Sequence, residues 1–367
     1  MHESAGLITF NSKNTEHRKA SFCNLSSIIA EIEKTGTTST QPLNNLTSSY
    51  RLLRNPRQKQ CQSNSCLTVD IIYLVKSAVS NFSQRKAIRE TWGKDGDIRI
   101  ITIFILGFSE SLQSFIETES IIHGDILQFD MQDIYDNLVY KTVFSIAWLC
   151  DSNINTKYVH FVDDDRMINS KNLLKLALNN LHQFEMKMIG YKANFEKPYR
   201  NKSSKWYISV TDYEFDVWPP YIIGGTMITN LQVIKMLREG IPFSRVIRIE
   251  DAYIGILARM LKISLEHNKN FTPFFISGYE LINKISSPDY RSYDAMIREW
   301  KVFNSVRNHT IHNKGRMEWN GKENGMENGM EWNGTQRNGT EEERREEEWS
   351  GVEWTGGEGK GREEKRK

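Results

Sequence analysis

Short apolar runs alternate with stretches of helical periodicity through most of the chain. Four runs rich in Val, Ile, Tyr and Phe have the length of buried strands, and they span residues 68–75, 100–106, 126–129 and 158–162. Between and after them, apolar residues recur at helical spacing in residues 83–92, 133–150, 170–181 and 251–261. Strands that alternate with helices predict an α/β fold with a mainly parallel central sheet flanked by helices.

The two ends of the chain depart from this pattern. Residues 1–66 are rich in Ser, Thr and Asn, which predicts a poorly ordered stem or linker with one short helix near residues 25–32. Residues 313–367 repeat Gly-Met-Glu-Trp-Asn-Gly and related units, a low-complexity composition that predicts a disordered tail. The sequence therefore predicts one folded domain over residues 67–312.

Composition narrows the partners and the compartment. A net charge of +2 without a Lys/Arg block gives no reason to expect a nucleic-acid partner. The four cysteines form no metal-type Cys-x-x-Cys pair, and their three disulfide pairings stay open. The density of Asn-x-Ser/Thr triplets fits a secretory-pathway chain, yet no apolar run reaches the ~18 residues of a membrane span. A luminal protein would need an anchor or signal that this chain lacks.

Three consecutive carboxylates, Asp163, Asp164 and Asp165, follow the predicted strand 158–162. Asp is depleted from strands, so we expect these acids just after the strand, where open α/β sheets place their ligand crevices. Mn²⁺ and Mg²⁺ suit such a site, because they bind few carboxylates together with substrate phosphates. Taken alone, the triplet slightly favours a solvated acidic turn.

Basic residues follow the first predicted strand. Arg85 and Arg89 stand four positions apart, so both project from one helix face and could clamp a diphosphate. A solvated basic face is the alternative, and spacing alone favours it. Further along, Lys205 and Trp206 precede a Pro-Pro-Tyr element and the pair Gly224 and Gly225, where backbone could approach a ligand closely. Core packing is about as good an explanation of Trp206.

Two acids, Glu250 and Asp251, begin the predicted helix 251–261. Acidic residues stabilise a helix N-terminus, and this explanation is sufficient for either residue alone. The functional alternative is a general base that removes a proton from an acceptor hydroxyl.

Six blocks in this order together resemble the β-1,3-galactosyltransferase and β-1,3-N-acetylglucosaminyltransferase family (glycosyltransferase family 31). The resemblance extends over roughly residues 67–265. The blocks are Arg-x-x-Ile-Arg-x-Thr-Trp-Gly at 85–93, Asp-Ile-Tyr-Asp-Asn-Leu at 133–138 with Lys-Thr at 141–142, Asp-Asp-Asp at 163–165, Lys-Trp-Tyr at 205–207, Pro-Pro-Tyr with Gly-Gly at 219–225, and Glu-Asp-x-Tyr-x-Gly at 250–255.

The resemblance implies an inverting, metal-dependent transferase whose catalytic domain, residues 67–312, has a nucleotide-sugar-binding α/β fold of the GT-A kind. It implies transfer of galactose or N-acetylglucosamine from a UDP-sugar, in β-1,3 linkage, to a glycan acceptor on a glycoprotein or glycolipid. Members are usually single-pass type II membrane proteins of the Golgi, so we expect a Golgi-lumen location. The anchor is absent from this sequence, as in a truncated gene model.

The resemblance also implies roles by position. Asp165 is expected to be the direct ligand of Mn²⁺ (or Mg²⁺), with Asp163 in the metal shell and both Asp163 and Asp164 beside the nucleotide. Asp251 is expected to be the catalytic base. The other positions expected to line the nucleotide-sugar site are Arg85, Arg89, Lys205, Trp206, Gly224, Gly225 and Glu250.

One departure bears on the metal site. Arg166 follows the acid triplet where members usually have an apolar residue. It is expected either to pair with a carboxylate and weaken metal binding or to contact a phosphate. The alternative function is therefore a non-catalytic relative that binds UDP or glycan. An unrelated phosphoryl-transfer enzyme is disfavoured, because the chain has no Gly-x-x-x-x-Gly-Lys-Ser/Thr loop.

Overall fold

A computed structural model describes residues 25–35, 38–57, 69–94, 99–152, 154–182 and 184–323. Contacts divide the chain into two units between Ile311 and His312, and the fold below belongs to the first unit. The parts of the expected stem and tail at 1–24, 58–66 and 324–367 lie outside the described residues.

Within the described residues, the central sheet orders eight strands as β1-β4-β3-β2-β5-β10-β7-β11. The neighbours β4, β3, β2 and β5 are parallel, as are β7 and β11, while β1 and β10 run antiparallel to their neighbours. The expected α/β fold with a mainly parallel sheet is confirmed. The strand bounds are β1 Leu52–Arg54, β2 Val69–Lys76, β3 Ile100–Phe108, β4 Ile126–Gln132, β5 Thr156–Asp163, β7 Lys187–Gly190, β10 Thr226–Asn230 and β11 Ser264–His267.

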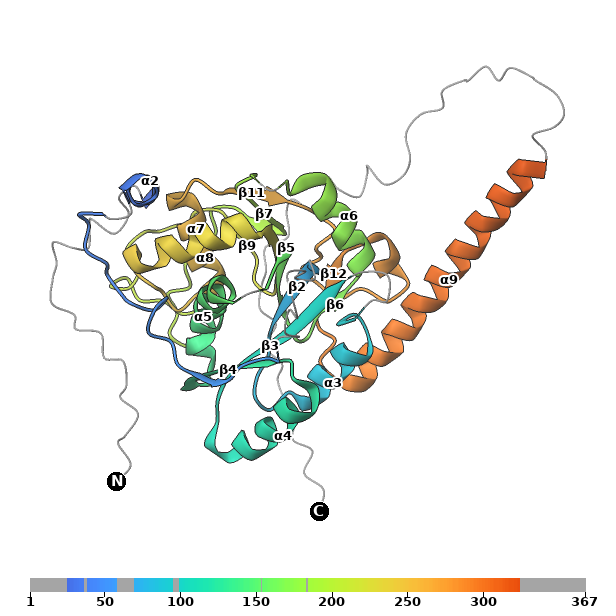
Figure 1. Cartoon of the computed structure of the whole chain (residues 1–367), viewed down its shortest axis with the longest axis horizontal. Coiled ribbons are helices and arrows are strands. Elements are labelled where there is room, and N and C mark those ends of the chain that lie inside the picture. The colour runs from blue at the N-terminus through green and yellow to red at the C-terminus, as the bar shows by residue number, and fades with distance from the viewer. Residues whose placement is uncertain are drawn as a thin grey trace, which may run out of the picture. The chain divides into compact units, whose positions relative to one another are not determined.

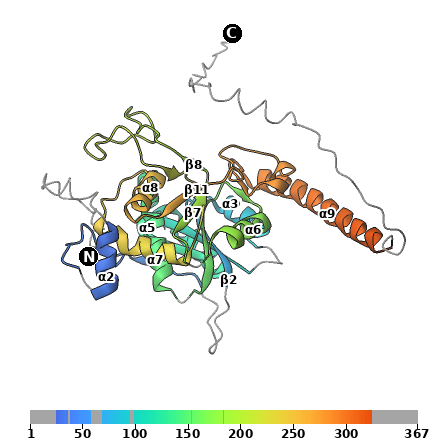
Figure 2. The same cartoon turned by 90° about the horizontal axis from the view of Figure 1, so that it is seen from above.

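Helices cover both faces of this sheet (Figures 1 and 2). One face packs against α2 (Leu25–Thr35), α5 (Leu138–Asp151), α7 (Leu231–Gly240) and α8 (Glu250–Met260). The other packs against α3 (Phe82–Glu90), α6 (Ser170–Asn180) and the first turns of α9 (Tyr293–Glu323). A smaller cluster packs Ile116 of α4 (Gln113–His123) with Leu106 of β3 and Ile126 of β4. Short strands complete the unit: β6 Met167–Ile168, β8 Lys192–Ala193, β9 Tyr221–Ile222 and β12 Ser286–Ser287.

The central strands β2 and β5 determine where the polar residues gather. Their apolar side chains are buried on both faces, as expected for parallel strands between two helical layers. They pair in register, so Lys76 at the end of β2 lies opposite Asp163 at the end of β5. This carboxyl edge is where open α/β sheets bind ligands.

Part of the segment expected to be a poorly ordered stem is packed on the domain. Helix α2 buries Leu25 and Ile29 in the core, and Leu46 is buried beside them. Strand β1 pairs with β4 and covers an otherwise open sheet edge. The short helix expected near residues 25–32 is confirmed as α2, whereas its packing on the core and the strand β1 were not expected, because the few apolar positions in this segment gave no sign of them. At the other end, α9 continues past residue 312 to Glu323.

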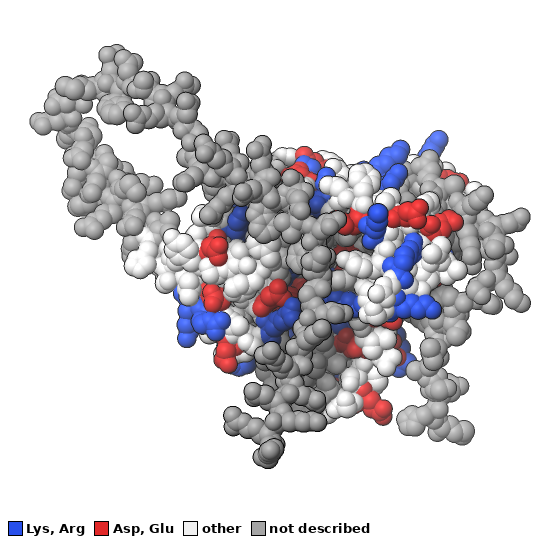
Figure 3. All heavy atoms as spheres, turned by 180° about the vertical axis from the view of Figure 1, so that it is seen from behind, with Lys and Arg blue, Asp and Glu red and all other residues white. Residues whose placement is uncertain are grey.

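Three further observations concern the charge on the surface, the state of Cys150 and the length of the helices. Lys and Arg side chains are interspersed with Asp and Glu on the face shown in Figure 3. Cys150 is a half-buried free thiol, whereas Cys23, Cys61 and Cys66 lie outside the described residues. Among the helices that the structure describes, none is both long and apolar enough to span a bilayer.

Candidate active site

A polar cavity of about 530 Å³ opens at the carboxyl edge of the parallel strands. The ends of β2 and β5, the start of α3, the segment before α5 and the segment before α9 all contribute to its wall. Its lining residues are Lys76, Ser77, Ala78, Asn81, Gln84, Asp133, Ile134, Tyr135, Leu138, Lys141, Asp163, Asp164, Asp165 and Arg291. The acid triplet therefore lines a ligand-sized cavity and is not a solvated turn.

Lys76 is the cation that joins the two acidic blocks of the site. Its buried Nζ lies 2.8 Å from Glu250 Oε2 and 3.2 Å from Asp163 Oδ1. Thr142 Oγ1 donates a 2.5 Å hydrogen bond to the other Glu250 oxygen, Oε1. Glu250 is thus held by Lys76 and Thr142 and does not line the acid-lined cavity, which favours a positioning role over its expected contact with the nucleotide sugar. The sequence analysis missed Lys76, although a charged residue that ends a buried apolar strand is a visible signal.

Asp164 connects the acid triplet by hydrogen bonds to the turn after β2. Its Oδ2 accepts hydrogen bonds from Ser77 Oγ (2.6 Å) and Asn81 Nδ2 (2.9 Å). Its backbone N–H donates to the Lys76 carbonyl at 3.2 Å. Burial raises the pKa of this carboxyl, and the two hydrogen bonds oppose the shift.

Asp165 presents the least engaged carboxylate of the triplet. Its backbone carbonyl accepts from Tyr290 N–H at 2.8 Å, but no side chain among the described residues donates to its carboxylate. Burial and the neighbouring Asp163 charge raise the pKa of Asp165 to about 6. Across the described residues, no three His, Cys, Asp or Glu side chains are grouped to hold a metal ion by themselves.

Arg85 and Arg89 are not free to clamp a diphosphate. The fully buried Arg85 guanidinium pairs with Glu119 of α4 at 2.7 Å and donates to the Ala78 carbonyl at 2.6 Å. Arg89 pairs with Glu119 and Asp125, both at 2.7 Å. This geometry corrects the expected role of both residues, because their charges are already neutralised. Arg85 still acts on the site indirectly, since its Nη1 donates to Ser77 Oγ, the hydroxyl that binds Asp164.

Arg166 lies beneath the site and not across its opening. It is buried, and it donates to the carbonyl oxygens of Thr272 (3.2 Å) and Gly224 (3.4 Å). Among the described residues it forms no direct ion pair, but the charges of Asp163 and Asp165 act on it. A Cβ at Gly225 would lie 2.6 Å from Arg166 Nε and 2.8 Å from Asp163 Oδ2, so the guanidinium lies close to the acid triplet. Of its two expected roles, a direct pair with a carboxylate is not seen in the described part of the chain, and contact with a phosphate stays a prediction.

The diglycine turn brings Asp163 and Asp251 close to one stretch of backbone. Gly224 N–H donates to Asp251 Oδ2 at 3.0 Å, and the Gly225 carbonyl accepts from Asp163 N–H at 2.9 Å. Gly225 has a φ of +95°, and a Cβ there would lie 2.8 Å from Asp163 Oδ2. Only glycine combines this left-handed conformation with so close an approach.

Asp251 is a partly buried acid in the first turn of α8. Its two oxygens accept backbone hydrogen bonds from Gly224 and Ala252. Burial and then the adjacent Glu250 charge raise the pKa of Asp251 to about 6, more than these hydrogen bonds lower it. A carboxylate with such a pKa is ionised at neutral pH and is a stronger base than an ordinary Asp.

Lys205 and Trp206 lie at the rim of the cavity. Both side chains are exposed, which excludes core packing for Trp206. Lys205 Nζ lies 4.6 Å from the Trp206 ring centroid and 5.9 Å from that of Tyr135, which lines the cavity. The structure thus brings the Lys-Trp-Tyr block beside the segment before α5, although neither Lys205 nor Trp206 lines the cavity itself, and the expected contact of both residues with the nucleotide sugar stays a prediction.

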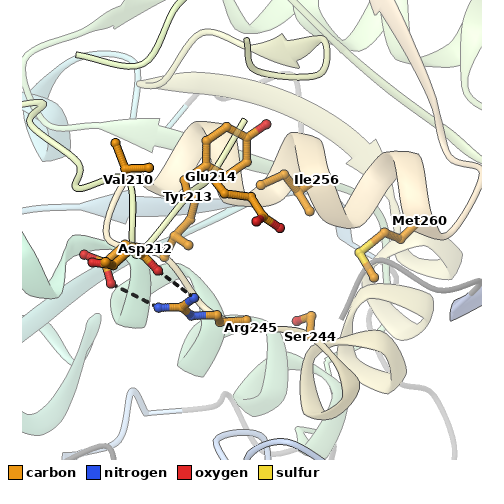
Figure 4. Close-up of a pocket in the computed structure, with 10 residues that line it drawn as sticks. Val210, Asp212, Tyr213, Glu214, Ser244, Arg245, Ile256 and Met260 are labelled. Carbon is orange, nitrogen blue, oxygen red and sulfur yellow. Dashed lines mark hydrogen bonds and ion pairs between the residues drawn. The ribbon is translucent and has the colours of Figure 1, made fainter. Parts of the chain in front are cut away.

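A second hollow lies on the other side of α8 (Figure 4). Ile256 and Met260 line it, and they follow Asp251 by five and nine residues, which puts them on a roughly opposite side of the helix. Figure 4 shows Arg245 bound to the segment at Asp212, with a 3.0 Å ion pair. This hollow is therefore separate from the acid-lined cavity.

Comparison with known proteins agrees with these features. The family model described as Galactosyltransferase matches residues 83–269. The chain is 35% identical over 241 residues to the Drosophila melanogaster beta-1,3-galactosyltransferase brn, covering 64% of this chain and 74% of that protein. It is 31% identical over 254 residues to the human UDP-GalNAc:beta-1,3-N-acetylgalactosaminyltransferase 1, covering 66% and 76%.

A solved structure of a glycosyltransferase involved in the glycosylation of the major capsid of PBCV-1 aligns with 64% of this chain and 99% of its own, at 11% identity and a TM-score of 0.32. The two curated relatives carry the assignment, because each aligns over about three quarters of its own length at more than 30% identity. Together with the family model over residues 83–269, they show that this chain is a glycosyltransferase and belongs to the galactosyltransferase family.

Proposed function

We propose that this protein is an inverting hexosyltransferase that moves galactose or N-acetylglucosamine from a UDP-sugar to a glycan acceptor in β-1,3 linkage. One observation carries the proposal: the diglycine turn holds Asp251 on one residue and Asp163 on the next. A basic carboxylate and an acid-lined, nucleotide-sized cavity therefore meet at a single turn. Direct displacement at a sugar carbon needs the carboxylate to accept the proton of the acceptor and the cavity to hold the nucleotide.

Asp251 acts as the general base. It accepts the proton of the acceptor 3-hydroxyl as that oxygen attacks the anomeric carbon of the donor sugar. The bond from that carbon to the UDP oxygen breaks on the opposite face, so the configuration inverts and UDP leaves with the bonding electrons. Glu250, held by Lys76 and Thr142, fixes the first turn of α8 so that Asp251 meets the acceptor in one orientation.

Asp165 and Asp163 would hold Mn²⁺ or Mg²⁺. The fit rests on the Asp165 carboxylate, which accepts no hydrogen bond from a side chain of the described residues; burial and the Asp163 charge raise its pKa, so a nearby positive charge would be favourable there. Two carboxylates would leave the remaining ligand positions to a diphosphate and water. When bound, the metal supplies positive charge that offsets the negative charge on the departing UDP. Asp164 and Ser77 keep the two acids in place.

The donor sugar and the compartment form the second part of the proposal. The relatives are named for transfer of galactose and of N-acetylgalactosamine, so the donor sugar requires a test with all three UDP-sugars. A Golgi-lumen location with a membrane anchor follows from the family expectation and from the many Asn-x-Ser/Thr triplets. The acceptor is a glycan of a glycoprotein or glycolipid.

The test is UDP release by the secreted protein with Mn²⁺, with UDP-galactose, UDP-N-acetylglucosamine or UDP-N-acetylgalactosamine and a panel of glycan acceptors. We expect acceptor-dependent release with one donor, loss of release in Asp251→Ala, and loss of both release and metal-dependent UDP binding in Asp165→Ala. Metal-dependent binding of UDP by a wild type that never turns over would favour the non-catalytic alternative. Absence of UDP binding would overturn both.

A further inference from the structure

Arg248 ties together two segments that frame the active site but lie far apart in the sequence. Its guanidinium donates to the carbonyl oxygens of Lys205 (3.1 Å) and Tyr207. It also forms an ion pair with Asp136, with Nε 3.1 Å from Oδ1. Arg248 precedes Asp251 by only three residues, so one side chain connects the Lys-Trp-Tyr loop, the segment before α5 and the start of α8.

Two aromatic rings, Tyr135 and Trp206, lie at this junction. The Arg248 guanidinium is 6.0 Å from the Tyr135 ring centroid, and Trp206 packs 5.3 Å from Tyr199. Burial and then the Asp251 charge raise the pKa of Tyr135, which places its hydroxyl within the electrostatic range of that carboxylate. Trp206 nevertheless leaves 42% of its surface exposed. Although Lys205 and Tyr199 contact the indole, its exposed part is available to a ligand.

We propose that Arg248 is a positioning residue that holds Trp206 and Tyr135 as the surface on which the acceptor sugar binds beside Asp251. Sugar rings present a face of C–H groups that packs on an aromatic ring, and the edge hydroxyl then points at the neighbouring carboxylate. This inference rests on the proposed transferase function and adds the acceptor subsite to it. The donor cavity has no need of Arg248, which does not line it.

The contacts exceed those of an ordinary surface ion pair. An exposed pair contributes little, and the Asp136 carboxylate is largely exposed. Arg248 adds two backbone carbonyls of the Lys-Trp-Tyr loop, and the planar guanidinium fits all three partners at once. A lysine could satisfy one of them. The loop position is therefore expected to depend on arginine and not only on positive charge.

The experiment compares the acceptor KM and the donor KM of Arg248→Ala, Arg248→Lys and Trp206→Ala. Arg245→Ala is the matched control, because Arg245 also holds a loop segment through one carboxylate and one carbonyl, but at the separate hollow of Figure 4. We expect Arg248→Ala and Trp206→Ala to raise the acceptor KM about tenfold, as for loss of one charged hydrogen-bond set. Arg248→Lys should restore only part of this loss. The donor KM, UDP affinity and slow hydrolysis of the donor by water should stay within about twofold.

An unchanged acceptor KM in Arg248→Ala would overturn the inference, as would a matching rise in Arg245→Ala. An equal loss of donor and acceptor binding with a lowered Tm would also overturn it, since Arg248 would then support the fold as a whole. Failure of the proposed function is distinguishable, because the wild type itself would transfer no sugar.

Discussion

At the scale of single residues, Asp251, the proposed general base, is held in a position that lowers the stability of the fold. Its carboxylate is held in a partly buried position beside another acid, and its pKa is raised to about 6. A carboxyl whose pKa is higher in the folded than in the unfolded protein costs no stability below the unfolded pKa. The loss of stability grows as the pH rises from the unfolded pKa through the folded pKa. The ionised base therefore destabilises the protein at neutral pH.

This cost predicts that Asp251→Asn abolishes transfer while it stabilises the protein. With a pKa near 6 against an ordinary value of 3.8, ionised Asp251 costs about 3 kcal/mol at pH 7.5. The Asn amide nitrogen cannot accept the second backbone N–H, which takes back about 1 kcal/mol, so we expect a net gain of about 2 kcal/mol that is lost by about pH 4. Urea unfolding at both pH values measures it. Asp130→Asn, at an exposed pair with Arg51, is the matched control and should change stability by less than about 0.5 kcal/mol. Equal effects of the two variants would contradict the prediction.

The same carboxyl predicts the acid limit of activity. Asp251 must be ionised to accept a proton, so kcat should fall as pH drops below about 6. Glu250 contributes to the raised pKa through its charge, so Glu250→Gln should move this limb to lower pH. A pH–rate profile at saturating donor, acceptor and Mn²⁺ measures both. A limb that stays in place in Glu250→Gln would show that another group titrates.

Sequence reasoning placed some of these residues and missed the partners of others. Their position at the ends of regular elements marked Asp165 and Asp251 as candidates, but position alone favoured a solvated turn and a helix N-terminus, and their roles were assigned from the resemblance of the six blocks together. Lys76 lies next to them only because β2 and β5 pair in register, which no local pattern encodes. The assignment of Arg85 failed for the same reason, since its partner Glu119 lies on α4, 34 residues away.

At the scale of elements, α3 and α4 are joined by a buried ionic cluster and not by an apolar interface alone. Glu119 accepts from both Arg85 and Arg89, and its pKa is lowered because these hydrogen bonds and charges outweigh its burial. Removal of one member of a buried set leaves uncompensated charge. The cluster also supports the site, because Arg85 binds the hydroxyl that holds Asp164.

Loss of this cluster should be costly. We expect Glu119→Ala to lower the free energy of unfolding by about 3–5 kcal/mol, because two guanidinium groups would stay buried without a shared acid. Glu117→Ala, two residues earlier on α4 and paired with Arg54 near the surface, should cost less than about 1 kcal/mol. Chemical denaturation of both variants tests the contrast. Similar losses would mean that α4 is sensitive to any change.

The elements with strong periodicity were predictable. The expected runs 100–106 and 126–129 became β3 and β4 with extended ends, and the helix expected over 251–261 begins one residue earlier. The strands β7, β10 and β11 were missed, because four or five residues carry too little pattern and their strand state depends on pairing across the sheet.

At the scale of the whole molecule, the N-terminal segment is part of the folded domain. Leu25, Ile29 and Leu46 together bury enough apolar surface to contribute about 5 kcal/mol as an upper estimate. This is comparable to the ~5–15 kcal/mol that stabilises a typical protein. β1 in addition covers the edge of β4, and an open edge promotes association between chains.

A chain that begins at residue 67 should therefore unfold at a lower temperature and self-associate, whereas one that begins at residue 25 should behave as the full chain does. Thermal unfolding and light scattering of the two forms measure this difference. Strands β4 and β3 separate β1 from β2 and β5, whose ends carry the proposed active site. We therefore expect the shorter form to retain some UDP binding at low temperature. A shorter form with an unchanged Tm and no association would show that α2 and β1 rest on the core without stabilising it. The first residue of the domain would then lie near 67, as the hydrophobic pattern alone indicates.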